Sequence, residues 1–138
     1  MTAKEYLKQI EYKKRLIERG KDRLRELSEL TVVIRGVSYD TDRVQTSAHA
    51  GMDGVEKLMD MERKLRKEIA RYLELSSKII DQINQLGDLQ CSELLYLRYV
   101  DCLRWEEIAC RMGIGIRGVY KAHGRALKLF AEKYKEFI

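Results

Sequence analysis

The sequence predicts an all-α protein in which a long antiparallel helical hairpin is followed by a helix-turn-helix domain. Three observations support this fold class. The 138 residues include no proline and only nine glycines, so long helices can form without a forced break. Apolar residues make up 45% of the chain, which is enough to build a core. In two long stretches these apolar residues recur every seven positions, as they do in paired helices.

The first helix is expected from about residue 3 to about residue 34. Thr2 and Glu5 have the spacing of a capping box, in which a hydroxyl and a carboxylate satisfy the first backbone N–H groups. Lys13 and Gly20 interrupt the heptad pattern. The residues on its two apolar positions are Ala3, Ile10, Ile17 and Leu24 on one, and Tyr6, Leu27 and Ile34 on the other.

The second helix is expected from about 54 to 86. One heptad position is apolar without a gap, and the other is broken only by Glu62 and Ser76. Such a pattern predicts a coiled-coil seam against the first helix. Between the two helices, residues 35–53 contain several Gly, Asp, Ser and Thr residues and are expected to form a loop. The apolar positions are Leu58, Leu65, Tyr72, Ile79 and Leu86, with Val55, Ile69 and Ile83 beside them.

A hairpin of two helices buries only one stripe on each helix. Leu7, Leu16, Leu73 and Ile80 would then be left half exposed on its flank. Exposed apolar surface of this kind favours a partner, so the sequence predicts a homodimer held through the hairpin. The alternative is a monomer in which a third helix, around Leu94, Leu95 and Leu97, covers the flank.

The helical hairpin is expected to form the first domain, residues 1–87, ending at Gly87, and the second domain is expected to span 88–138. Its helices are expected at about 89–100, 105–112 and 116–135. The last two have the spacing of a helix-turn-helix, in which an apolar and a small residue precede the turn and a glycine makes it. The residues in this pattern are Ile108, Ala109, Gly113, Ile114, Val119 and Ala122.

The distribution of charge predicts a polyanionic partner. The net charge is only +5, but no acidic residue lies between Glu107 and Glu132. A one-sign stretch of this kind suits nucleic acid, although a solvated helix face would look the same. The basic residues in this window are Arg111, Arg117, Lys121, Arg125 and Lys128.

The second helix of this motif is expected to enter the major groove of DNA. With Val119, Ala126, Leu127 and Phe130 facing the core, helical geometry turns the basic residues outward. Arg117 can offer a bidentate fork to guanine and Lys121 a point charge. Arg125 and Lys128 lie further along and suit phosphates. Tyr120 is expected either to contact DNA or to pack at the edge of the core, and His123 to pack.

Four short runs, Leu97–Val100, Trp105–Ala109, Met112–Ile114 and Arg125–Leu127, resemble the region-four domain of bacterial sigma factors. The resemblance implies a helix-turn-helix that reads the upstream element of a promoter. Nearly the whole chain, including 42–47 and 123–127, is similar to ArpU- and RinA-type proteins. That resemblance implies a regulator of late genes of phages and prophages in Gram-positive bacteria.

Two positions depart from the sigma pattern. Cys102 stands where such domains usually have glycine, and Arg104 stands where serine or threonine usually caps the second helix. Arg104 cannot cap through an oxygen acceptor, so we expect it to contact a DNA phosphate instead. Nothing in the chain resembles the sigma domain that opens the promoter, and the length is too short for a complete sigma factor.

The function predicted from these features is a sequence-specific DNA-binding transcriptional regulator, an activator of phage late genes that recruits RNA polymerase. The alternative is a DNA-packaging protein similar to a small terminase subunit. No enzyme is expected, because there are two histidines, no glycine-rich phosphate loop and no catalytic carboxylate pair or triad. The three cysteines, an odd number, favour a reducing compartment without disulfides. We expect no metal, no cofactor, no membrane segment and a cytoplasmic location.

Overall fold

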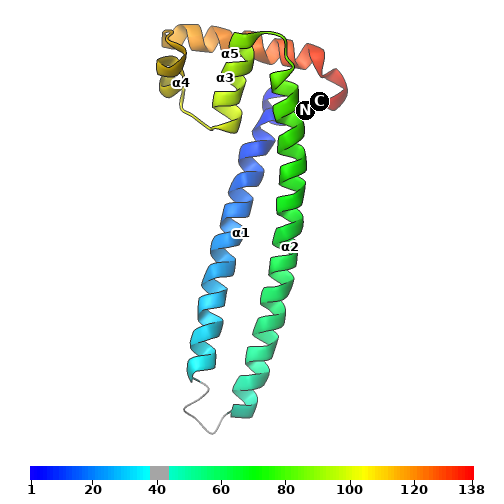
Figure 1. Cartoon of the computed structure of the whole chain (residues 1–138), viewed down its shortest axis with the longest axis vertical. Helices are drawn as coiled ribbons and strands as arrows, with labels where there is room; N and C mark the ends of the chain where they lie inside the picture. The colour runs from blue at the N-terminus through cyan, green and yellow to red at the C-terminus, as the bar shows by residue number, and fades with distance from the viewer. Residues whose placement is uncertain (38–43) are drawn as a thin grey trace. The chain divides into compact units, whose positions relative to one another are not determined.

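The computed structural model describes the backbone of residues 1–37 and 44–138, and the side chains of 1–32 and 54–138. All regular structure in these residues is helical, which confirms the predicted fold class. Across them, no helix combines the length and apolar character of a transmembrane span. In chain order the elements in Figure 1 are α1 (Ala3–Val37), α2 (Val44–Asn84), α3 (Leu89–Leu95), the π-helical turn η2 (Tyr96–Val100), α4 (Trp105–Met112), α5 (Ile116–Lys133) and the 3₁₀ turn η3 (Lys135–Phe137).

The chain divides into two compact units, and the division differs from the predicted boundary at residues 87 and 88. One unit, here called the head, consists of Met1–Lys14 and Tyr72–Ile138. The other, the arm, consists of Arg15–Arg71. The first turns of α1 and the last turns of α2 belong to the head because their apolar side chains share a core with the C-terminal helices.

The core of the head explains the largest departure from the hairpin prediction. Leu7, which a hairpin alone would leave half exposed, is 0% exposed and shares one core cluster with Leu94 and Leu97, in line with the alternative in which a third helix covers this part of the flank. Leu94 and Leu95 of α3 are also 0% exposed. The hairpin ends contribute Ala3, Tyr6, Leu7, Ile10, Ile79, Ile83 and Leu86, and α3 to α5 contribute Cys91, Leu94, Leu95, Leu97, Tyr99, Ile108, Val119, Ala122, Ala126 and Phe130.

Hydrogen bonds at the end of α2 join it to three other parts of the head. The Tyr6 hydroxyl donates to Gln82 Oε1 at 2.8 Å, and the Tyr134 hydroxyl donates to the Gln82 carbonyl oxygen at 2.7 Å. The Ser92 hydroxyl donates to the Ile83 carbonyl oxygen at 2.8 Å. Tyr134 and Ser92 thus donate to backbone carbonyl groups in the last turn of α2, where a helix leaves carbonyls without intrahelical partners, whereas Tyr6 bonds the Gln82 side chain. Together they join α1, α3 and the end of α5 to α2.

The helix ends follow the predicted signals. The Thr2 N–H donates to Glu5 Oε2 at 2.8 Å and the Glu5 N–H donates to Thr2 Oγ1 at 3.2 Å, which completes the capping box. Gly87 has a φ of 92°, a left-handed conformation that glycine adopts easily. Asp88 then caps α3 by accepting a hydrogen bond from the Cys91 N–H at 3.0 Å.

In the arm, α1 and α2 run antiparallel with a close approach at Gly20. A Cβ added to Gly20 would lie 2.9 Å from Leu65 Cδ1, so a larger residue would require the Leu65 side chain to move. Gly54 lies opposite Thr31, with a Cβ position 3.8 Å from Thr31 Oγ1. Gly20, which interrupts the heptad pattern in the sequence, is therefore a contact position in the structure.

The predicted loop at 35–53 is wrong at both ends. α1 continues to Val37, and α2 begins at Val44. The prediction depended on Gly36, Gly51 and Gly54 and on several Asp, Ser and Thr residues, but a glycine only weakens a helix and does not by itself end one. Of the family-like run 42–47, residues 44–47 lie in α2, whereas 42 and 43 lie outside the described residues.

Candidate nucleic-acid interface

The turn between α4 and α5 has the geometry that the sequence pattern predicts. Gly113 has a φ of 66°, and its N–H donates to the Cys110 carbonyl oxygen at 3.3 Å. The Ile114 N–H donates to the Ala109 carbonyl oxygen at 3.2 Å, which closes the end of α4. Ile108 and Val119 are 0% exposed. The two helices are therefore packed as a helix-turn-helix.

The turn before α4 contains the first departure from the sigma pattern. Cys102 has a φ of 57°, and among the described residues it is the only non-glycine residue with a positive φ. This is the backbone conformation for which glycine is suited, so the chain keeps the turn and places a strained residue in it. The Leu103 N–H then donates to the Leu97 carbonyl oxygen at 3.0 Å.

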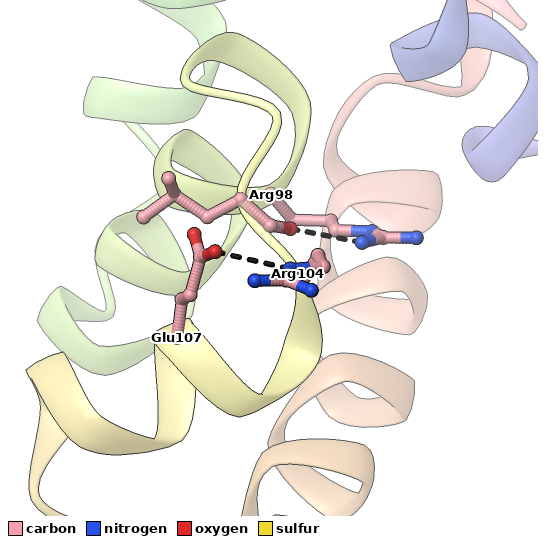
Figure 2. A network of polar contacts seen from close by, with 4 residues as sticks. Arg98, Arg104 and Glu107 are labelled. Carbon is pink, nitrogen blue, oxygen red and sulfur yellow. Dashed lines mark hydrogen bonds and ion pairs between the residues drawn. The ribbon is translucent and has the colours of Figure 1, made fainter.

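The second departure, Arg104, does not prevent α4 from beginning at Trp105. Its side chain makes no capping hydrogen bond. Instead Arg104 Nε lies 3.1 Å from Glu107 Oε1, at the third position of α4, as Figure 2 shows. Glu107 is an acidic residue near a helix N-terminus, where the helix dipole favours negative charge. The Arg104 side chain is 81% exposed, so its guanidinium can still reach a phosphate.

α5 presents one polar, basic face to solvent. Its opposite face is buried through Val119, Ala122, Ala126 and Phe130, as predicted, whereas Leu127 is half-buried. Arg111, at the end of α4, is exposed as well. Arg117, Tyr120, Lys121, Arg125 and Lys128, which the sequence singled out, are all exposed, and so is Gly124 among them.

Tyr120 is exposed to solvent and also packs against a core-edge side chain, so the structure is compatible with both of the roles expected for it. It is 52% exposed, so part of the residue is accessible to a partner. Its ring also meets Trp105 edge-on, with centroids 5.7 Å apart. Trp105 in turn lies under the Arg98 guanidinium at 4.2 Å. Arg98 also donates a hydrogen bond to the Leu103 carbonyl oxygen at 2.9 Å, drawn as a dashed line from Arg98 in Figure 2. The start of α4 and Tyr120 are therefore held by the same group of side chains.

His123 packs beneath this group. Its Nε2 lies 2.7 Å from the Tyr99 hydroxyl, and its ring meets Trp105 at 4.6 Å. Burial, with Lys4 and Arg98 nearby, lowers the pKa of His123 to about 4. Burial also raises the pKa of Tyr99 to about 12. Both side chains are therefore uncharged at neutral pH, and they join η2 to α5 without adding to the basic face.

Arg125 differs from the other basic residues of α5. It donates a hydrogen bond to Gln90 Oε1. A hydrogen bond with the Cys91 side chain, together with the nearby Asp88 carboxylate, raises the pKa of Arg125. The first turn of α3 thus holds the Arg125 guanidinium, which ties α5 to α3 within the head.

Ile116 was missed by the sequence reasoning, which searched the window for charge. It lies in the first turn of α5, beside Arg117, and is 37% exposed. An apolar side chain at the start of such a helix can contact the methyl group of thymine. The signal that could have found it is its position: an isoleucine in the first turn of this helix and outside the buried stripe of Val119, Ala126 and Phe130.

The described part of the chain contains no candidate metal-binding site. No group of three or more His, Cys, Asp or Glu side chains there could hold a metal ion. The three cysteines, Cys91, Cys102 and Cys110, form no disulfide.

Residues 78–130 match the family described as "Sigma-70, region 4". The match begins in α2 and ends at the buried Phe130, so it includes part of the hairpin as well as the helix-turn-helix. This agrees with the head, rather than residues 88–138 alone, being the compact unit. No curated protein and no solved structure matches the chain. The helix-turn-helix is therefore similar to sigma region four, a DNA-binding domain.

Proposed function

We propose that this protein is a sequence-specific transcriptional regulator whose recognition helix is α5. The observation that carries the proposal is the exposed basic face of α5 from Arg117 to Lys128, a stretch without acidic residues, on a helix-turn-helix that matches sigma region four. Binding, not catalysis, is the proposed activity.

In this proposal the first half of α5 lies in the major groove. Arg117 reaches guanine through two parallel hydrogen bonds, and Lys121 and Tyr120 contact neighbouring base edges. Ile116 adds an apolar contact with thymine. The remaining cations, which are more distant from the start of α5 or lie on α4, bind phosphates and position the protein without reading sequence. They are Arg104, Arg111, Arg125 and Lys128.

We further propose that the protein acts at promoters by recruiting RNA polymerase. The support is the similarity of the head to a sigma domain, which works on promoter DNA. The resemblance of the chain to ArpU- and RinA-type proteins makes late genes of a phage or prophage the proposed targets, and the bacterial cytoplasm the proposed location.

The arm is proposed to hold two copies together. Leu16, Leu30 and Met59 are 42%, 54% and 51% exposed on its surface, and a second copy would cover them. A dimer also suits a DNA-binding domain, because two half-sites discriminate better than one. The same apolar residues would suit a ring, as in a DNA-packaging protein. A measured mass of eight or more chains would favour packaging, and a mass of one or two chains would favour regulation.

Binding of the full-length protein to a labelled DNA duplex, followed by fluorescence anisotropy over a range of salt concentrations, tests the proposal. If about four of the cations meet phosphates, log K against log salt should have a slope of about −3.6. A flat response, or no binding at low salt, would contradict a phosphate-dominated interface. Replacing a basic residue on α5 that binds a phosphate with a neutral residue should bring the slope closer to zero by about 0.9.

A further inference from the structure

Gly124 lies in the middle of the basic face of α5, and the fold itself does not require a glycine there. It is exposed, and a Cβ added to it would meet no atom within 4 Å. It has no positive φ that would exclude other residues. A glycine inside a helix weakens that helix relative to alanine. Position 124 therefore carries a cost in stability that no contact within the described structure explains.

The neighbours of Gly124 indicate what approaches it. Arg117, Lys121 and Lys128 stand seven and three residues before it and four after it, so they share its side of the helix. All three are exposed. Gly124 is thus a gap without a side chain between cations, and a polyanion bound by these cations would press against the bare backbone of α5.

We propose that one deoxyribose–phosphate strand of the DNA packs directly against the α5 backbone at Gly124. This inference rests on the proposed function and adds a contact site to it. Base contacts in this type of domain come from the start of the recognition helix, whereas Gly124 is the ninth residue of α5. At this depth the helix leaves the groove and passes the sugar–phosphate chain. The missing Cβ lets Lys121 reach a base edge on one side, and Lys128 a phosphate on the other, without holding the strand away.

The test uses Gly124→Ala in the full-length protein, with Gly118→Ala as the matched control. Gly118 is also in α5, but its Cβ position points at Ile114, 3.6 Å from the Cδ1 atom, which is ordinary packing within the protein. Both variants should melt about 3 °C above the wild type, because each replaces a helical glycine. Binding to a fluorescein-labelled mixed-sequence duplex is then measured by anisotropy over a range of salt.

Gly124→Ala should weaken DNA binding about tenfold, the loss that one overpacked methyl group gives, while Gly118→Ala binds as the wild type does. The salt slope should not change, because every cation remains. Gly124→Gln, which is larger but equally suited to an exposed helix, should weaken binding further. The loss should be the same for duplexes of different sequence.

Three results would overturn the inference alone: Gly124→Ala binding as tightly as the wild type, an equal loss in Gly118→Ala, or a loss confined to one DNA sequence, which would place a base edge at Gly124. Failure of the wild type itself to bind DNA is distinguishable from these, because it would overturn the proposed function as well.

Discussion

The hydroxyl of Tyr99 lies 2.7 Å from Nε2 of His123, and this contact joins η2 to the side of α5 that faces away from the basic surface. The two rings also stack, with centroids 5.9 Å apart. Because Trp105 packs on His123 and Tyr120 packs on Trp105, the contact supports the start of α4 and one residue of the proposed DNA-binding face.

This contact predicts a loss of stability on mild acidification. The pKa of His123 is lowered from 6.5 to about 4 in the folded protein, so between these values the unfolded chain binds a proton that the folded protein does not. Stability is complete above pH 6.5 and falls as the pH falls toward 4. We expect His123 to account for about 1–2 kcal/mol, after allowing for its partial exposure. Urea unfolding at pH 7.5 and 4.5 measures it, and an unchanged pH dependence in His123→Gln would contradict the assignment.

Cys102→Gly should stabilise the protein. Cys102 has a φ of 57°, and relief of the strain in this conformation outweighs the extra freedom that glycine gives the unfolded chain. The expected gain is about 1 kcal/mol in the free energy of unfolding. Cys102→Ala is the control, because it removes the sulfur but keeps the strained backbone. A gain in Cys102→Ala equal to that in Cys102→Gly would show that the sulfur, not the backbone, is responsible.

Alanine substitutions should separate Arg125 from the other basic residues of α5. Arg117→Ala and Lys121→Ala should each weaken specific DNA binding by about 1–3 kcal/mol, with the melting temperature unchanged. Arg125→Ala should lower the melting temperature as well, because Arg125 is tied to Gln90 and the first turn of α3. Anisotropy and thermal unfolding of the same samples make the comparison. Unchanged operator preference in both Arg117→Ala and Lys121→Ala would mean that α5 is not the recognition helix.

Leu16→Glu combined with Leu30→Glu should convert the proposed dimer to a monomer, because both residues are exposed on the arm. Leu89→Glu is a suitable control, since Leu89 is 85% exposed but lies in the head. Sedimentation equilibrium at micromolar concentration measures the mass. A wild type that sediments as a monomer refutes the dimer. A fragment that begins at Asp88 does not serve this purpose, because it lacks Leu7, Ile79 and Ile83 of the core.

Heptad spacing and turn residues predicted much of this fold because both act locally. The capping box at Thr2 and the left-handed Gly113 need only the residues around them, and both are as expected. For Leu7 the sequence left two possibilities, a second copy or a third helix around Leu94, and local patterns could not decide between them, because its burial depends on residues distant in sequence. The start of α2 at Val44 was not predicted, because a glycine weakens a helix without necessarily ending it.

The candidate site shows the same limit. Helical periodicity was enough to place Arg117, Lys121 and Lys128 on one exposed face. Periodicity could not show that Arg125 is held by Gln90, because that contact spans 35 positions of the sequence. The contact of Tyr120 with Trp105 likewise depends on how α4 crosses α5.

The central claim is that α5 reads DNA sequence, and selection of bound duplexes from a random pool by the full-length protein tests it most directly. The wild type should enrich one motif, and Arg117→Ala should relax the preference at a single guanine position within that motif. Enrichment of no motif by a folded wild type, or the same motif at the same strength with Arg117→Ala and Lys121→Ala together, would contradict the claim.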